Sequence, residues 1–413
     1  MTPSPRQPST AWVLAVTLAI QSLASAATIA PAVVAPVATR ELGLPSSAIG
    51  FYMALVYLGA MFTSVIGGTL VNRLGAVRCS QAALLLCGLG MGLLCSGGPV
   101  LAGLGALVIG AGYGPITPSS SYLLMRSTPA HRMSLVFSVK QTGVPLGGVL
   151  AALASPQIEH VLGWRWALGG CAVACLLCML VAQSVRRSLD VPGEPAAPWR
   201  WQDLARPVGL VWRTPALRLM AVCSLLFSFI QLAITAYLVT YLNLSLGWTL
   251  IAAGVILSLS QVAGVAGRIL WGIVADRWAP PRKVLGGLAL TMAASCVATA
   301  FLQPSTPWML VAAVAVLFGA SAIGWNGVFL AEVARRAPAG QAGVATGGTL
   351  LFTYFGVLVG QPLFSYVASL TGRAGQPGYA WAYGLLVIPA LFCATWLLRA
   401  RDPVRAGPSE PAR

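Results

Sequence analysis

Two basic residues stand inside long apolar stretches of the sequence. Lys140 lies eight residues after Arg132, and Arg268 lies eight residues before Asp276. On helices that rise 1.5 Å per residue, each of the two is about 12 Å from its flanking charge. In an apolar layer about 30 Å thick, that distance places both near the middle. A cation at such a depth binds an anion or backbone carbonyls, and a lysine can also lose its proton.

No acidic residue of the sequence is placed to neutralise these two cations. The nine acids all lie in loops or at helix ends: Glu41, Glu159, Asp190, Glu194, Asp203, Asp276, Glu332, Asp402 and Glu410. Arginine keeps its charge at physiological pH, so Arg268 needs carbonyls, water or an anion, whereas Lys140 can become neutral. We therefore predict an anion-binding pair. Separate structural roles, or a different helix register, are the alternatives.

The composition requires a membrane around these residues. Of 413 residues, 57% are hydrophobic and 8% charged, against about 25% charged in a soluble domain. Spans of about 20 apolar residues predict an all-α membrane protein with twelve transmembrane helices. We expect them near 11–37, 46–72, 78–97, 99–125, 133–157, 163–185, 216–242, 247–275, 284–303, 307–333, 342–369 and 378–398. The first run is longer than the apolar region of a signal peptide, so a retained span is expected.

The net charge of +16 is explained by topology. If the N-terminus is cytoplasmic, twenty of the 25 Lys and Arg residues fall in cytoplasmic segments, and only Arg40, Arg165 and Arg373 fall in outer ones. The positive-inside rule then places both termini in the cytoplasm. A multi-pass membrane protein is expected, and the charge gives no reason to expect nucleic acid as a partner.

The chain divides at its longest polar connection. We predict an N-terminal six-helix bundle over 1–185, a cytoplasmic linker over 186–215 and a C-terminal bundle with a cytoplasmic tail over 216–413. The linker mixes tryptophan and arginine at 199–201 and 212–213. This mixture is typical of a membrane-surface segment, and a partner-binding element is the alternative.

An internal repeat relates the two parts. Asn72 in the segment 67–78 matches Asp276 in 271–283 at an offset of 204 residues. Gly110-Ala111-Gly112 matches Gly319-Ala320-Ser321, and Arg126 matches Arg335, both at an offset of 209. These offsets predict two pseudo-symmetric six-helix bundles that arose by duplication.

Three segments resemble the major facilitator superfamily. They are Gly68–Arg78, Gly163-Trp164-Arg165-Trp166, and the run from Lys140 to Gly148. The resemblance implies a transporter that works by alternating access, without enzymatic activity or cofactor. It also implies that helices 5 and 8 bring Lys140 and Arg268 towards one cavity. The run 267–272 is similar to the eighth helix of monocarboxylate and oxalate/formate carriers, whose arginine contacts a substrate carboxylate, although relatives of other specificity carry a similar arginine.

The same resemblance implies a cytoplasmic latch that holds the halves in one state. The family signature has an acid where this chain has Asn72, which cannot form an ion pair. We therefore expect the latch to depend more on Asp276. Its predicted members are Asn72, Arg73, Arg78, Arg126, Asp276, Arg277, Glu332 and Arg335. Solvated loop charges of little energetic value are the alternative.

Polar faces complete the expected site. Thr17, Gln21, Ser25 and Thr28 share one helix face, as do Ser224, Ser228, Gln231 and Thr235. Helices 1, 4, 7 and 10 surround the cavity in the family fold. The predicted substrate-binding residues are Lys140, Arg268, Gln21, Ser25, Tyr113, Gln231, Thr235, Trp325 and Asn326. Packing between helices is the alternative for each hydroxyl. Glycine and proline at 110–118, 143–148, 319–327 and 356–362 mark places where helices bend or pack closely.

Other chemistry is not indicated. The cysteines lack metal-ligand spacing, and no nucleotide-binding glycine loop occurs. We predict a secondary active or facilitative carrier of a small organic anion, a carboxylate; a co-transported proton, a counter-anion, or uniport without either partner are the alternatives for coupling. It would act as a monomer in the lipid bilayer. A drug/proton antiporter is the alternative transporter, and a transport-inactive receptor, which would need an added soluble domain, is the alternative from another class.

Overall fold

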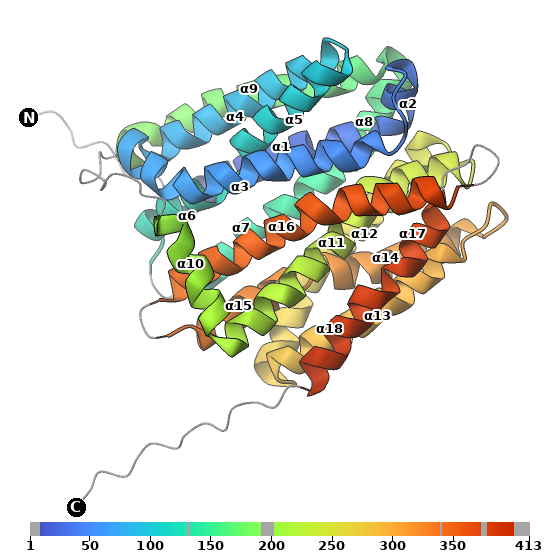
Figure 1. Ribbon diagram of the computed structural model, residues 1–413. Helices are drawn as coiled ribbons and strands as arrows, with labels where there is room; N and C mark the ends of the chain where they lie inside the picture. The colour runs from blue at the N-terminus through green and yellow to red at the C-terminus, as the bar shows by residue number, and fades with distance from the viewer. Residues whose placement is uncertain (1–8, 130–132, 191–201, 339–340, 373–377, 400–413) are drawn as a thin grey trace, which may run out of the picture.

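A computed structural model describes residues 9–129, 133–190, 202–338, 341–372 and 378–399. Over these ranges the regular structure is entirely α-helical (Figure 1). Eleven helical segments are long and apolar enough to cross a membrane. The remaining expected span, the fifth in the chain (133–157), is present as two shorter helices, α7 and α8. The predicted fold of twelve transmembrane helices is confirmed in this form.

The helices form two halves. The N-terminal half contains α1 (Thr10–Val33), α2 (Ala35–Glu41), α3 (Ala48–Leu74), α4 (Ala76–Cys95), α5 (Pro99–Tyr113), α6 (Ile116–Ser127), α7 (Met133–Gln141), α8 (Gly143–Leu162) and α9 (Trp164–Leu189). The linker helix is α10 (Gln202–Arg213). The C-terminal half contains α11 (Pro215–Leu244), α12 (Leu250–Arg277), α13 (Pro281–Ala300), α14 (Trp308–Ala322), α15 (Asn326–Arg336), α16 (Ala342–Leu370), α17 (Tyr379–Leu385) and α18 (Val387–Arg399).

Three of the four predicted glycine- and proline-rich segments interrupt a helix. The expected span 99–125 breaks between α5 and α6, the span 133–157 between α7 and α8, and the span 307–333 between α14 and α15. Span 11 differs, because α16 continues through Pro362. There the glycines serve packing: a Cβ added at Gly356 would clash with the carbonyl oxygen of Leu225 on α11. The predicted glycine segments therefore have two uses, interruption in three helices and close approach in the fourth.

The internal repeat is visible in matching helix contacts. A Cβ at Gly110 on α5 would clash with the carbonyl oxygen of Val56 on α3. A Cβ at Gly319 on α14 would clash with the carbonyl oxygen of Ser260 on α12. Gly319 follows Gly110 at the offset of 209, and Ser260 follows Val56 at the offset of 204. The same helix crossing therefore occurs once in each half.

The linker helix lies against the C-terminal half, as Figure 1 shows. The rings of Trp212 and Phe352 stack at 6.3 Å and 8°. A Cβ at Gly348 would come 2.6 Å from the carbonyl oxygen of Pro207. The tryptophan-arginine segment at 199–201 lies outside the described residues. Trp212 thus stacks on Phe352 but stays 55% exposed, and the membrane-surface role of the linker stays a prediction.

The end of the molecule opposite the chain termini carries α2 (Figure 1). Glu41 at the end of α2 pairs with Arg165 and accepts a hydrogen bond of 2.5 Å from Trp164 Nε1 on α9. The hydrogen bond from Arg165 holds the pKa of the Glu41 carboxyl below its ordinary value. Because both members of the ion pair are about half exposed, its main effect is to orient α2 rather than to stabilise the fold.

Candidate functional site

Arg268 joins the two halves through main-chain carbonyls. Its Nε donates to the carbonyl oxygen of Ile323 at 3.1 Å, and its Nη1 donates to that of Gln141 at 2.5 Å. Ile323 ends α14 in the C-terminal half, whereas Gln141 ends α7 in the N-terminal half. The expected need of Arg268 for carbonyl partners is met at an interface between halves.

Both carbonyls belong to helix interruptions. The Gln141 carbonyl would bind the N–H of residue 145 in a continuous helix, but that residue is Pro145, which has no N–H. The break at Thr142 turns this carbonyl towards α12, where Arg268 reaches it. Ile323 lies in the turn between α14 and α15. The interruptions thus supply the acceptors that the guanidinium needs within the apolar layer.

Lys140 lies beside this arrangement without a bonding partner. The residue is 1% exposed, and its Nζ has no hydrogen-bond partner among the described residues. It is close enough to Arg268 for the two positive charges to repel each other. The described acids that form ion pairs, Glu41 and Glu332, bind arginines at helix ends. A buried amine with three potential donors and no acceptor is costly, and a bound anion would remove that cost.

A small central cavity lies between the halves. Its volume is about 20 Å³, which is room for about one water molecule. The lining residues are Ser25, Thr28, Ile29, Tyr57, Tyr113, Val144, Gln231, Leu232, Thr235, Gln261 and Ile323. Lys140 and Arg268 do not line it, but Val144 and Ile323 connect it to the segments that carry the two cations. The cavity thus gathers polar side chains from both halves around one small space.

The structure brings together part of the predicted polar lining. Ser25, Tyr113, Gln231 and Thr235 line the cavity, as the sequence predicts. Trp325 and Asn326 do not line it; their Nε1 and Nδ2 both donate to Gln231 Oε1, at 3.0 and 3.1 Å. They therefore orient Gln231 from behind the cavity.

Gln21 is also placed differently from the prediction. It is 1% exposed and packs against Gly143, where a Cβ would come 2.9 Å from its side-chain carbons. Its Oε1 has no hydrogen-bond partner in the described part of the chain. Gln21 thus presents an unused acceptor near the start of α8, outside the central cavity.

Replacement of Gln231 by leucine is expected to destabilise the protein by about 1–2 kcal/mol, because the donors of Trp325 and Asn326 lose the acceptor of two partly buried hydrogen bonds. Thermal unfolding in detergent measures this change. Gln183→Leu is the control, since it removes an exposed hydrogen bond to Gln81. Equal melting temperatures for the two variants would contradict the orienting role of Gln231.

Two polar residues of the cavity, Gln261 and Tyr57, were neither in the predicted site nor on a predicted polar face. Gln261 is 2% exposed, and its Nε2 lies 3.5 Å from Thr235 Oγ1. It precedes Arg268 by seven residues, or about two helical turns, so both project from one face of α12. The seven-residue spacing from Arg268 therefore marks Gln261 in the sequence as a candidate site residue. Tyr57 lies in an apolar run on α3 and had no comparable signal.

Three of the predicted latch residues, Arg126, Glu332 and Arg335, have described contacts on their own helices. Glu332 binds Arg335 at 3.0 Å and Arg336 at 2.5 Å, all on α15. Arg126 lies 5.0 Å from the ring of Tyr122 on α6. The side chain of Asn72 lies outside the described residues. The role of Asp276 and its neighbours in holding the halves together stays a prediction.

Asp190 places a negative charge beside Val77 and Arg78 that the sequence motif did not predict. Its carboxylate accepts hydrogen bonds from the backbone N–H groups of Val77 at 2.8 Å and Arg78 at 3.1 Å. It thereby caps the start of α4 from the end of α9, where a carboxylate is favoured. Gly75 takes a φ of +91° beside it, and a Cβ there would come 2.5 Å from the carboxylate. Asp190 thus stabilises the turn that follows Asn72.

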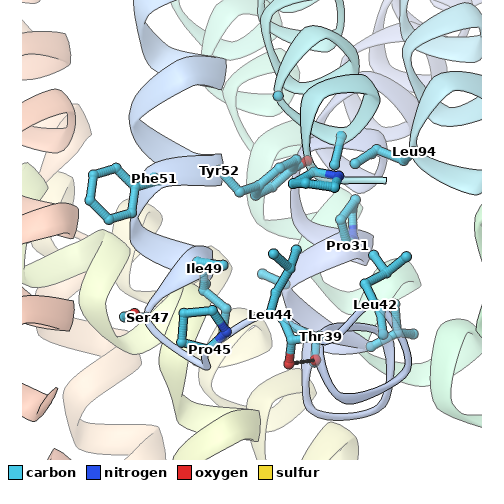
Figure 2. Close-up of a pocket in the computed structure, with 18 of the residues that line it drawn as sticks. Pro31, Thr39, Leu42, Leu44, Pro45, Ser47, Ile49, Phe51, Tyr52 and Leu94 are labelled. Atoms are coloured by element: carbon cyan, nitrogen blue, oxygen red, sulfur yellow. Dashed lines mark hydrogen bonds between the residues drawn. The ribbon is translucent and has the colours of Figure 1, made fainter. Parts of the chain in front are cut away.

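The N-terminal half also contains an apolar pocket of about 350 Å³ near α2. Figure 2 shows Pro31, Leu42, Leu44 and Ile49 around it, with Tyr52 and Leu94 on one side. Its polar side chains are Thr39, Ser47 and Tyr52, and no charged residue lines it. It therefore lacks the chemistry to bind an anion, and the candidate site remains the region of Lys140 and Arg268.

Comparison with known proteins identifies the family. A sequence profile of the Major Facilitator Superfamily matches residues 14–361. The chain belongs to this superfamily. The fold agrees: the crystal structure of a D-xylose-proton symporter superposes with a TM-score of 0.76 at 15% identity, over 94% of this chain and 97% of that one. Members of the superfamily are transporters, so the expectation of a non-enzymatic protein is confirmed.

Relatives with named substrates include carriers of carboxylates. Monocarboxylate transporter 13 of Rattus norvegicus is 25% identical over 82% of this chain and 79% of its own. The benzoate transport protein of Acinetobacter baylyi is 22% identical over 91% of this chain and 86% of its own. An uncharacterized superfamily transporter of Mycobacterium tuberculosis is 25% identical over 69% of this chain, and the match spans 58% of that relative.

Proposed function

We propose that this superfamily transporter carries a small organic anion, a carboxylate, across the bacterial inner membrane by alternating access. The observation that carries the proposal is the buried Nζ of Lys140 beside Arg268, for which the described part of the chain supplies no hydrogen-bond partner. The carboxylate carriers among the relatives support it. The distribution of charges supports a cytoplasmic location for both termini.

A carboxylate would complete the bonding of both cations. Its two oxygens can accept from the Lys140 ammonium and from the remaining N–H groups of Arg268 at the same time. Tyr113 is near enough to Arg268 to interact with it electrostatically and could donate its O–H. Because the central cavity holds only about one water, it must widen before an anion of this size enters it.

Lys140 also offers a route for coupling. An amine that is neutral in the empty site would take a proton from solvent when the carboxylate enters, since the ammonium then has a counter-charge. One proton would accompany one monoanion, and transport would be electrically neutral. Exchange against a counter-anion is the other coupling that we test, because a second anion can neutralise the site on the return step.

The test is uptake of radiolabelled benzoate into proteoliposomes that contain the purified protein. We expect Arg268→Ala and Lys140→Ala each to reduce the initial rate at least about tenfold, as truncation in a buried charge site does. Lys283→Ala is the control, because this lysine is exposed at the start of α13.

Two further uptake measurements with the same proteoliposomes test the coupling. An inward pH gradient should stimulate uptake if a proton accompanies the anion, whereas internal unlabelled benzoate should stimulate it if the carrier exchanges anions. Unchanged uptake in both alanine variants would overturn the anion site. Transport of amphipathic cations such as ethidium, with no effect of carboxylates, would support the drug/proton antiporter instead.

A further inference from the structure

The hydroxyl groups in the wall of the apolar pocket near α2 are bonded to main-chain carbonyls. Thr39 Oγ1 donates to the carbonyl oxygen of Ala35 at 2.6 Å, and Tyr52 Oη donates to that of Thr28 at 3.0 Å. Neither hydroxyl proton is therefore free to bind a ligand in the pocket. What these two side chains present to an occupant is a methyl group and an aromatic ring.

The indole of Trp164 lines the same pocket with its ring and not with its N–H. Its Nε1 donates to Glu41, which does not line the pocket. Ser47, in the turn before α3, is the remaining polar side chain of the wall. A polar group that entered would lose its hydrogen bonds to water without replacement. The pocket therefore fits a hydrocarbon body.

The size of the pocket also favours hydrocarbon over water. Its volume is about 350 Å³, within the range of about 300–1,000 Å³ that is usual for small-molecule sites. A buried water needs about two to four polar partners, which these walls do not offer. Wall atoms without a neighbour also lose dispersion contacts. An apolar chain restores those contacts, so it is the occupant that the walls favour.

The pocket lies where lipid chains can reach it. Its wall includes Phe51 in the first turn of α3, and Pro99 and Gly103 near the start of α5. Leu101 and Leu104 stand beside the last two on α5 and are exposed. Exposed apolar side chains of spanning helices face the lipid. A chain can therefore enter beside α3 and α5 directly from the bilayer.

A positive charge lies at the rim of the pocket. Arg40 directly follows Thr39 of the wall; it is exposed, and the ion pairs among the described residues do not include it. Its neighbour Glu41 is paired with Arg165. Glu159 lies at the end of α8, which contributes no residue to the wall. One net positive charge therefore remains at the rim, and arginine binds phosphate through two parallel hydrogen bonds.

The order of these features matches the order of groups in a lipid. Figure 1 shows α2 at the end opposite the chain termini, which is the outer end in the topology that the charges predict. In Figure 2 the turn with Leu44 and Pro45 lies on the side of the pocket opposite Tyr52 and Leu94. Arg40 thus stands at headgroup level, and the apolar walls extend from it towards the hydrocarbon layer.

We propose that this pocket binds an anionic phospholipid of the outer leaflet, with one acyl chain in the pocket and the phosphate on Arg40. A zwitterionic lipid has the same chains, but its ammonium group offsets the phosphate charge, so Arg40 selects the anionic one. The pocket is distinct from the region of Lys140 and Arg268. The site therefore does not depend on which substrate is transported.

The bound lipid would stabilise the N-terminal half. The pocket wall combines residues of α1, α2, α3, α4, α5 and α9, such as Pro31, Ala38, Ile49, Leu94 and Leu168. All six helices belong to one half. A ligand that contacts all of them in the folded protein alone raises the melting temperature in proportion to its occupancy.

The test of the headgroup is thermal unfolding of delipidated protein in mild detergent. The protein is titrated with dioleoylphosphatidylglycerol or with dioleoylphosphatidylcholine, and we expect the anionic lipid to raise the melting temperature at lower concentration. Arg40→Gln should weaken its apparent affinity about tenfold, which corresponds to about 1.4 kcal/mol, and leave the zwitterionic lipid unaffected. Arg399→Gln is the matched control, since Arg399 is exposed in the last turn of α18.

The test of the pocket is photocrosslinking in proteoliposomes. Phosphatidylglycerol with a diazirine in one acyl chain is irradiated, and labelled peptides are mapped by mass spectrometry. We expect label within residues 31–55, reduced about tenfold by Gly103→Phe if the ring competes with the chain by about 1.4 kcal/mol. A Cβ at Gly103 would lie 3.6 Å from Leu55 Cδ1, an ordinary contact. Gly92→Phe is the control, because Gly92 is exposed on α4 and a Cβ there would meet nothing within 4 Å.

Each measurement has an outcome that overturns the proposal. Equal effects of the two lipids, or equal losses in Arg40→Gln and Arg399→Gln, would overturn the role of Arg40. Unchanged labelling in folded Gly103→Phe would overturn the pocket. If that variant is not monodisperse, Ala38→Phe fills the pocket from α2 and decides the question. Displacement of the label by oleate, but not by unlabelled phosphatidylglycerol, would make a free fatty acid the occupant and overturn the phospholipid.

Discussion

Replacement of Lys140 by methionine is expected to raise the melting temperature of the protein and to abolish anion uptake. Methionine keeps most of the length of the side chain and removes an amine whose Nζ has no partner among the described residues. A basic residue within the membrane costs about 2 kcal/mol or more, and an apolar side chain of similar volume recovers much of that cost. The same change removes the donor that we assign to the carboxylate. Stability and transport should therefore move in opposite directions.

The nine cysteines supply the measurement, because a thiol-reactive dye reports their exposure as the protein unfolds. Lys283→Met is the matched control, since Lys283 is the other lysine of the chain and is exposed. We expect it to change neither melting temperature nor uptake. A lower melting temperature for Lys140→Met would mean that Lys140 stabilises the fold, and a separate structural role would replace the anion site.

Substitution of Gly319 or Gly110 by alanine is expected to destabilise the protein by about 3 kcal/mol, the upper part of the range for an overfilled core. In each case the added carbon clashes with a backbone carbonyl, that of Ser260 or Val56. Relief requires two membrane helices to separate, and their close packing is a main source of stability in lipid. Because the two contacts are counterparts in the repeat, the two variants should lose similar amounts of free energy.

Gly287→Ala is the control for both substitutions. Gly287 is exposed on α13, and a Cβ there would meet nothing within 4 Å. Alanine at such a helical position stabilises by about 0.4–1 kcal/mol, because the unfolded chain loses conformational freedom. Thermal unfolding of the three variants in one detergent tests the comparison. Equal melting temperatures for Gly319→Ala and Gly287→Ala would show that α14 and α12 can separate without cost.

The fold could be predicted from the sequence because a membrane leaves few choices. Apolar runs of about 20 residues must be helices, since every backbone group needs an internal partner. The interruptions at 114–115 and 142 were predictable from glycine and proline in the same runs. The continuous course of α16 through Pro362 was not, because sequence alone cannot distinguish a glycine that permits a bend from one that permits close packing.

Less of the candidate site could be predicted. The depth of Lys140 and Arg268 followed from their distance to flanking charges, and Ser25 and Thr235 followed from helical spacing. The acceptors of Arg268 are main-chain carbonyls of Gln141 and Ile323, and no side-chain pattern marks them. Asp190 reaches the start of α4 from a distant helix end, so only the packing of α9 on α4 reveals its role.

The offset between the two copies of the internal repeat changes along the chain, and this change shows where insertions are tolerated. Helix α13 repeats α4 at an offset of 205, whereas α14 repeats α5 at 209, so the extra residues lie in the turn from Phe301 to Pro307, opposite Ser96–Gly98. A turn at the membrane surface absorbs added residues, because no neighbouring helix depends on its register. One residue added inside a helix would rotate everything beyond it by about 100° and turn Gly319 away from the carbonyl of Ser260, or Gly110 away from that of Val56. Insertions are therefore tolerated in the turns and excluded from the helices whose glycines face the backbone of another helix.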